Sequence, residues 1–351
     1  MTVVRSLFTR VAFVGLAAAL ASPGVVVPVV AQGAGTGAGT PSTHLIVVSG
    51  LGGQPEYSDL FFSQAESLVE AALERWGVPV ENITWLAEAP ERAPGRISAR
   101  STKEAFEAEI LSVAGRAGPQ DGVLIVLIGH GSAKGDDSRI NLPGPDMSGD
   151  DLAVALGAFS TQTIAIVNTA SASGGFVSAL SGERRIVVTA TRSGREKEWT
   201  YFGSYFVDAF LDDGADTDKD ERVSLLEAFQ FASHEVERRY ERDNQLLTEH
   251  ALLDDNGDRE GSAEPAATGA DGSLAGRFFL ASAGRSVVEQ AAADPELAAL
   301  LAEKTRLEAA IAELRRLKDS MDPAVYDAEL ERLVLDLAAK NRAIRNRGGG
   351  A

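Results

Sequence analysis

Short apolar runs alternate with longer amphipathic stretches through most of this chain, and this alternation limits its possible folds more than any other feature. The apolar runs occupy residues 44–49, 82–86, 123–128, 163–167 and 186–191, and helical spacing occurs at residues 60–76, 102–114 and 150–159. Apolar strands that alternate with helices are typical of a mainly parallel sheet with helices on both faces. The sequence therefore predicts an α/β domain, in which ligands collect beyond the carboxyl ends of the strands.

Size and charge restrict what this domain can contact. The chain has 351 residues, of which 44% are hydrophobic, which is enough to bury a substantial core. Its formal net charge is -18. Because a surface of this sign repels nucleic acid and anionic lipid, we expect no nucleic-acid partner and a preference for cations.

The N-terminal segment has the regions of a secretory signal peptide. Arg5 and Arg10 precede an apolar run at residues 11–21, and small or short residues precede a cleavage point after Ala31. We therefore predict a signal peptide at residues 1–31 and a periplasmic or secreted protein.

The segment that follows favours export over membrane anchoring. Pro23 and Pro28 argue against a stable spanning helix, so no membrane span is expected after cleavage, with an uncleaved N-terminal anchor as the alternative. Residues 32–43 are rich in Gly, Thr and Ser and predict a flexible linker. The chain contains no cysteine, so no disulfide can stabilise the exported protein.

Two of the predicted strands end in residues that can carry chemistry. The strand at 123–128 runs into Gly129-His130-Gly131-Ser132, and the strand at 163–167 runs into Asn168-Thr169-Ala170-Ser171-Ala172-Ser173-Gly174-Gly175. A nucleophile needs a base within hydrogen-bond reach and donors that hold the oxyanion. Because the carboxyl ends of neighbouring parallel strands meet at one edge of a sheet, we expect His130 and Ser171 to approach each other.

This arrangement resembles the caspase and legumain superfamily of His/Cys peptidases (clan CD). There the catalytic His ends one strand in a His-Gly pair, and the nucleophile ends the next in an Ala-Cys pair followed closely by Ser-Gly. The resemblance predicts a caspase/legumain-like domain at residues 44–285, with Ser171 in the place of the Cys and His130 as the other member of the dyad. It also implies an oxyanion hole lined by the backbone N–H groups of Gly131 and Ser171.

The same resemblance assigns a role to residues 187–192, which look like the family's strand and substrate-facing loop after the nucleophile. Arg192 and Arg195 follow that strand. On this interpretation their guanidinium groups are candidates for contacting an acidic side chain, against the simpler interpretation that they are surface arginines.

The serine changes the chemistry of the predicted dyad. A thiol is partly ionised near neutral pH, whereas a hydroxyl must lose its proton during attack and needs a close, oriented base. Replacing Cys by Ser171 therefore predicts a peptidase homologue that is catalytically inactive and binds peptide or protein partners in the former substrate cleft.

Two enzymatic hypotheses use the same serine. One is an active serine peptidase with Ser171 as nucleophile and His130 as base. The other is an α/β-hydrolase elbow at Thr169-Ala170-Ser171-Ala172-Ser173, completed by a later acid and His250, although the elbow lacks both of its usual glycines.

Residues 216–227 match the twelve-position EF-hand loop, the most specific motif of the chain. The predicted ligands are the carboxylates at positions 1, 3, 5 and 12, the carbonyl at position 7 and the hydroxyl at position 9, which are Asp216, Asp218, Asp220, Glu227, Arg222 (backbone) and Ser224. Helical stretches at residues 201–211 and 225–240 flank the loop. We therefore predict a structural Ca²⁺ ion, weakened by Glu221 where position 6 normally has Gly.

A second acidic cluster runs from Asp254 to Gly261 without the full pattern. Its Asn256-Gly257 pair predicts a turn, and a second cation loop is the alternative. The chain has no zinc spacing, phosphate loop or dinucleotide fingerprint, so no organic cofactor is expected.

The C-terminal segment predicts two helices joined by a proline turn. Leucine and isoleucine recur at helical spacing over residues 295–317 and again over 324–345, on either side of Ser320-Met321-Asp322-Pro323. We expect an antiparallel hairpin, or coiled coil, at residues 295–347 that closes on itself or on the main domain, or through which the chain recruits a partner or another copy. A calcium-stabilised scaffold that acts through this hairpin is therefore a third functional hypothesis.

Overall fold

The computed structural model describes residues 42–135, 137–211, 213–220, 222–280, 294–316 and 321–348. The predicted signal peptide, most of the predicted linker and Glu221 lie outside these ranges, as do the last residues of the predicted 44–285 domain. Among the helices of the described ranges, none is long and apolar enough to cross a bilayer.

A seven-stranded sheet with the order β10-β9-β8-β4-β1-β2-β3 forms the centre of the domain. Its strands are β1 (Thr43–Ser49), β2 (Ile83–Ala87), β3 (Ala99–Arg100), β4 (Gly122–Ile128), β8 (Thr163–Asn168), β9 (Arg185–Thr189) and β10 (Leu252–Asp254). All neighbours are parallel except β10, which pairs antiparallel with β9. The sheet grows from β1 in both directions, so the strand order reverses between β1 and β4. The mainly parallel α/β fold is therefore confirmed.

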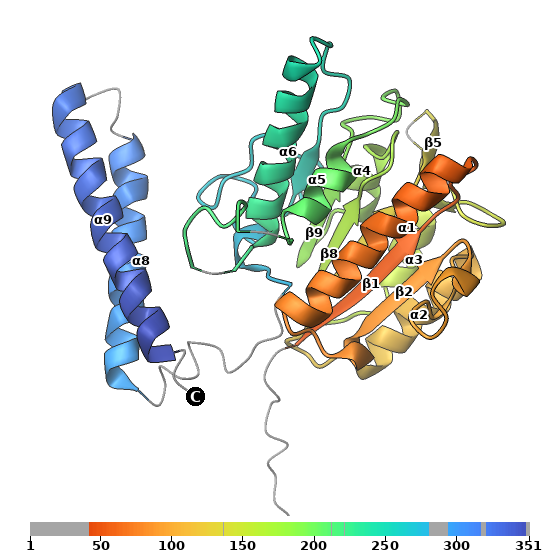
Figure 1. Cartoon of the computed structure of the whole chain (residues 1–351), viewed down its shortest axis with the longest axis horizontal. Coiled ribbons are helices and arrows are strands. Elements are labelled where there is room, and N and C mark those ends of the chain that lie inside the picture. Colours follow the sequence, from red (N-terminus) through yellow and green to blue (C-terminus); the bar gives the residue numbers. More distant parts are fainter. Residues whose placement is uncertain are drawn as a thin grey trace, which may run out of the picture. The chain divides into compact units, whose positions relative to one another are not determined.

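Helices cover both faces of the sheet because its central strands are apolar on both sides. Leu45 and Val47 of β1 face one core, and the alternating residues Ile46 and Val48 face the other. The first core is covered by α1 (Pro55–Glu70), α5 (Phe202–Asp208) and α6 (Leu225–Arg242). The second is covered by α2 (Lys103–Arg116), α3 (Gly149–Leu156) and α4 (Gly175–Leu180). Figure 1 shows α1, α5 and α6 together over one face.

Side chains at the helix starts fix where several helices begin. The hydroxyl of Thr102 accepts the Ala105 N–H at the start of α2, and Ser148 with Asp151 forms a capping box at the start of α3. The first helix begins earlier than predicted, because Pro55 occupies its first position, where a proline needs no hydrogen-bonded N–H. It ends in a π-helical turn, η1 (Ala71–Arg75).

Short polar elements were not predicted. After His130 the chain forms a ribbon of β5 (Gly131–Lys134), β6 (Asp137–Ile140) and β7 (Met147–Ser148) before α3 begins. These strands are too short and too polar to stand out as apolar runs. The remaining elements are the single turns η2 (Val80–Asn82), η3 (Pro90–Arg92) and η4 (Ala275–Arg277).

The C-terminal segment forms the predicted hairpin of α8 (Pro295–Arg316) and α9 (Pro323–Gly348), which lie side by side in Figure 1. Its own small core contains Leu307, Ile311, Leu314, Tyr326 and Leu333. Arg347 near the end of α9 pairs with Asp294 and with Glu296 at the start of α8. The two helices therefore bury their apolar stripes against each other.

Candidate functional site

The pairing of β4 with β8 brings His130 and Ser171 to the same edge of the sheet. Leu127 lies opposite Asn168 in the parallel register, and His130 and Ser171 each follow three residues later. A Cβ atom on Gly131 would overlap the carbonyl oxygen of Ser171, so only a glycine lets the two segments approach this closely. The structure therefore brings together the two residues that the sequence singled out.

Three aromatic rings surround the imidazole of His130. The ring centroids of Tyr57, Phe61 and Trp199 lie 4.6, 5.1 and 6.0 Å from that of His130, all edge to face. Burial lowers the pKa of His130 below its usual range, and a hydrogen bond with the backbone of Gly52 opposes this effect only in part. The imidazole is therefore neutral at pH 7 and able to accept a proton.

The hydroxyl of Ser171 has a backbone hydrogen-bond partner. Ser171 is buried, and its Oγ donates to the backbone carbonyl of Gly131 at 3.4 Å. The next residue, Ala172, has a φ of 52°, in the left-handed region that costs a non-glycine residue about 1 kcal/mol. Its N–H donates to the carbonyl of Glu196 at 2.6 Å, which helps to hold the strained turn.

The Ser-Gly pair after Ser171 is fixed to the end of β9. The N–H groups of Ser173 and Gly174 donate to Thr191 Oγ1 at 2.8 and 3.2 Å. A Cβ on Gly174 would overlap the backbone of Arg192 and Ser193. This close packing accounts for the residues that follow Ser171, and the oxyanion role of the Gly131 and Ser171 N–H groups stays a prediction.

The two predicted substrate-facing arginines differ in their surroundings. The guanidinium of Arg192 pairs with Glu196 at 3.0 Å, whereas Arg195 is exposed. Glu196 also contacts His250: Oε1 of the glutamate lies 2.7 Å from Nδ1 of the histidine. Glu196 and His250 thus form an acid–histidine pair. The backbone carbonyl of Glu196 also accepts the N–H of Ala172, in the turn after Ser171.

The neighbouring Glu249 is a buried carboxylate that sequence reasoning missed. It accepts the N–H of Tyr201 at 2.9 Å and that of Phe202 at 3.2 Å, which anchors the start of α5. Burial raises its pKa to about 7, opposed by these backbone hydrogen bonds and reinforced by the charge of Glu196. No local pattern marks it, because its partners lie almost fifty residues earlier.

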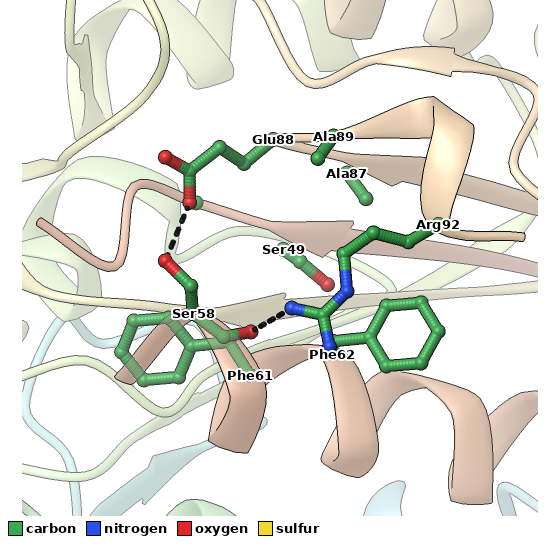
Figure 2. Close-up of a pocket in the computed structure, with 9 residues that line it drawn as sticks. Ser49, Ser58, Phe61, Phe62, Ala87, Glu88, Ala89 and Arg92 are labelled. Carbon is green, nitrogen blue, oxygen red and sulfur yellow. Dashed lines mark hydrogen bonds between the residues drawn. The ribbon is translucent and has the colours of Figure 1, made fainter. Parts of the chain in front are cut away.

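A cavity of about 170 Å³ opens at the carboxyl ends of β1 and β2 (Figure 2). Its main lining residues are Ser49, Ser58, Phe61, Phe62, Glu88 and Arg92. The Glu88 carboxylate accepts the Gly52 N–H and the Ser58 hydroxyl, both at 3.1 Å. Because Phe61 also contacts the His130 ring, this cavity adjoins the dyad.

The predicted calcium loop brings three of its four acids around one point, whereas Asp220 pairs with Arg222 and Lys304. Asp216, Asp218 and Glu227 have carboxylate oxygens that all lie within 4.8 Å of one another. The N–H of Asp220 donates to Oδ1 of Asp216 and of Asp218, both at 3.1 Å, and the N–H of Arg222 donates to Asp220 Oδ1 at 2.9 Å. This donor set suits a hard cation such as Ca²⁺.

The ninth and twelfth positions of the loop also cap α6. Ser224 and Glu227 form a capping box, and the second oxygen of Glu227 accepts the N–H and the hydroxyl of Thr217, both at 2.9 Å. Desolvation, and then the charge of Asp220, raise the pKa of Asp218 to about 6. Left-handed backbone occurs at Lys219, the fourth position, with a φ of 60°.

This loop lies at the edge of the sheet opposite to His130. Ser224 forms an antiparallel bridge with Phe279, whose carbonyl accepts the hydroxyl of Thr43 at 3.2 Å. Thr43 begins β1, so the bridge marks the amino edge of the sheet, whereas His130 and Ser171 follow the carboxyl ends of β4 and β8. Any effect of a bound ion on the dyad would therefore act through the fold.

Comparison with known proteins finds one family model that is similar to part of the chain. Residues 107–252, which include His130 and Ser171, match the family model described as Peptidase C13 family. A search of curated proteins found no significant match.

Two solved structures show distant similarity. The crystal structure of the Drosophila initiator caspase Dronc aligns at 9% identity over 62% of this chain and 81% of its own, with a TM-score of 0.40. The crystal structure of a protein from Geobacter sulfurreducens aligns at 10% identity over 61% of this chain and 93% of its own, with a TM-score of 0.37.

Burial of Glu249 makes the free energy of unfolding of the chain depend on pH. The pKa of Glu249 is raised in the folded protein, so between about pH 4.5 and pH 7 the unfolded chain loses a proton that the folded chain keeps. The free energy of unfolding should fall as pH rises through this window, by at most about 1.4 kcal/mol per pH unit. Urea unfolding at pH 4.5 and 7.5 should show that Glu249→Gln removes this part of the slope, whereas Glu241→Gln, on the exposed side of α6, keeps it. Identical slopes in Glu249→Gln and the native chain would contradict the assignment.

Proposed function

We propose that the chain is an exported homologue of caspase/legumain-like peptidases that binds a peptide or protein segment beside His130 without cleaving it. The family match over residues 107–252 supports this relationship. The observation that carries the loss of cleavage is the backbone partner of the Ser171 hydroxyl, which donates to the Gly131 carbonyl. Export is motivated by the signal-peptide pattern of residues 1–31, and the intact mass of the protein recovered from a periplasmic fraction checks it.

The surroundings of Ser171 support the loss of cleavage. Attack by a hydroxyl requires its proton to pass to the base as the new bond forms. The imidazole of His130 is neutral, but its orientation is set by the Gly52 backbone and three aromatic rings. The hydroxyl would have to leave the Gly131 carbonyl before its proton could pass to the ring. A thiolate needs no such transfer at the moment of attack.

The binding half of the proposal is supported by the cavity beside the dyad. Its volume of about 170 Å³ is close to that of an engineered cavity that holds a benzene ring, so one side chain of a bound segment fits. The rings of Phe61 and Phe62 supply apolar contact, and Glu88 supplies a carboxylate at the wall. Pockets of this mixed kind fix the orientation of a ligand.

Turnover of a fluorogenic peptide and ester library in millimolar Ca²⁺ tests the function. We expect no turnover by the native chain or by Ser171→Ala, and peptide cleavage by Ser171→Cys. A peptide cleaved by Ser171→Cys should then bind the native chain, as measured by fluorescence anisotropy. Ser178→Cys, which adds a thiol to α4 away from the dyad, is the matched control.

The alternative is an active serine hydrolase, and one contact supports it. Glu196 and His250 form an acid–histidine pair at 2.7 Å, in the order Ser171, Glu196, His250 along the chain. Native turnover that Ser171→Ala abolishes would overturn the inactive homologue. His130→Ala and His250→Ala would then identify the base, because only one of the two should abolish turnover.

We further propose that the loop at residues 216–227 binds a structural Ca²⁺ ion. The fit rests on the three carboxylates of Asp216, Asp218 and Glu227, whose oxygens converge. Asp220, the Arg222 carbonyl and Ser224 would complete the oxygen ligands. The ion would join the end of α5 to the start of α6 and so stabilise the helices that cover one face of the sheet.

Calcium should raise the melting temperature of the native chain. An ion at about a hundred times its Kd stabilises a protein by about 2.7 kcal/mol. Glu227→Gln keeps an oxygen for the α6 cap but removes a charge from the loop, so its calcium-dependent shift should be smaller. Glu237→Gln, on the exposed side of the same helix, should respond like the native chain. Equal shifts in Glu227→Gln and the native chain, measured by scanning calorimetry with Ca²⁺ and with EDTA, would remove the ion from this loop.

A further inference from the structure

The acidic cluster that begins at Asp254 repeats the hydrogen bonding of the loop at 216–227. Backbone N–H groups donate to acidic or amide side chains two or three residues earlier: Gly257 to Asp254 Oδ1 at 3.1 Å, Asp258 to Asn256 Oδ1 at 2.8 Å and Glu260 to Asp258 Oδ1 at 2.8 Å. The fourth position is left-handed in both loops, with a φ of 83° at Gly257 and 60° at Lys219. The two segments therefore share one backbone shape, which turns their side-chain oxygens inward.

A buried carboxylate oxygen in this cluster has no protein partner. Asp254 is 1% exposed; its Oδ1 accepts the Gly257 N–H, and its Oδ2 has no hydrogen-bond partner within the described part of the chain. Leaving such an oxygen desolvated and unpaired is costly. Because Oδ1 of the same carboxylate bonds the loop backbone, Oδ2 lies at the loop and not in the apolar core.

The acids of this cluster have no cation paired with them. Neither Asp254, Asp258 nor Asp271 forms an ion pair with any cation of the described ranges. The Asp271 carboxylate accepts the Asp255 N–H at 3.1 Å. Within the described part of the chain, the cluster is thus a set of acidic oxygens without an ion-pair partner.

The carboxylate of Asp255 is occupied by backbone N–H groups of a later segment. It accepts the N–H groups of Gly272, Leu274 and Ala275 at 2.8, 2.7 and 2.8 Å. These bonds hold residues 272–275 against the loop. The twelfth position counted from Asp254 is Pro265, so this loop has no carboxylate at the position that Glu227 occupies in the other loop.

We propose that Asp254, Asn256 and Asp258 form a second divalent-cation site, with the Glu260 carbonyl as a further ligand. An all-oxygen set of carboxylate, amide and carbonyl groups on a flexible loop suits Ca²⁺ better than Mg²⁺, which demands a near-ideal octahedron. The site is distinct from the loop at 216–227 and does not depend on the proposed function.

The loop that the ion would order contacts three parts of the chain at the edge of the sheet. Asp254 ends β10, and Asp255 holds the segment that leads to η4. The loop itself reaches the turn after α4, where the Arg259 N–H donates to Ser181 Oγ at 3.1 Å. Removing the ion should therefore loosen the antiparallel edge strand and the segment at 271–275.

Calorimetric titration of the EDTA-treated full chain with CaCl₂ tests the proposal. We expect two bound ions in the native chain, one in Asp254→Asn and one in Glu227→Gln. Asp258→Asn, at an exposed position, provides a second variant that should fold even if Asp254→Asn does not, and it should also lose one ion. Glu264→Gln, an exposed acid beside the loop, should keep both.

Stability in EDTA gives an independent readout. Without the ion, Asp254→Asn removes an unpaired buried charge, so it should melt at or above the native temperature; with Ca²⁺ it should melt below it. A native chain that binds one ion, lost in Glu227→Gln and kept in Asp254→Asn and Asp258→Asn, would overturn the second site and leave the first. An ion lost only in Asp254→Asn and Asp258→Asn would support the second site and overturn the first.

Discussion

The parallel pairing of β4 with β8 is the interaction on which the candidate site depends. Its register sets Leu127 opposite Asn168, and each strand then continues for three residues to His130 or Ser171. Sliding one strand by a single residue would turn its side chains to the other face of the sheet, so the two apolar cores hold this register in place. Gly131 completes the arrangement, because any larger residue would separate the two strand ends.

Around this pair the fold encloses His130 and anchors the turn that follows Ser171. The imidazole of His130 is enclosed by aromatic rings and kept neutral by burial, and the turn after Ser171 is strained and anchored. Such strain persists only where the surrounding structure holds it. These features support the proposal of a cleft that recognises a chain without cutting it, since recognition needs shape and contacts whereas cleavage needs a proton transfer as well.

Much of the fold could be predicted from the sequence because buried parallel strands are continuous apolar runs, and the dyad could be predicted because strand ends carry the chemistry of such sheets. The residues that surround the dyad could not be predicted. Tyr57 and Phe61 come from α1 and Trp199 from a loop, and only the tertiary packing brings their rings to His130. Glu249 looks like any other acid in the sequence, yet it is buried against backbone donors from residues 201 and 202. The calcium-loop pattern can be recognised in the sequence because all its proposed ligands are local, whereas the hydrogen bonds from residues 272–275 to Asp255 leave no local pattern.

The amino edge of the sheet is where an exported chain without disulfides could gain cross-links of another kind. The segment from Asp271 to Phe279 contacts both acidic loops: Asp255 holds its beginning, and Phe279 bridges to Ser224 near its end. An ion in either loop would order one end of this segment and so reduce the entropy that the other end loses on folding. Two weak sites joined by one segment would then stabilise the edge together, while His130 and Ser171 at the opposite edge remain open to a ligand. The proposed cations would then stabilise the fold at one edge of the sheet, and the cleft at the other edge would bind the ligand without a direct contact between the two.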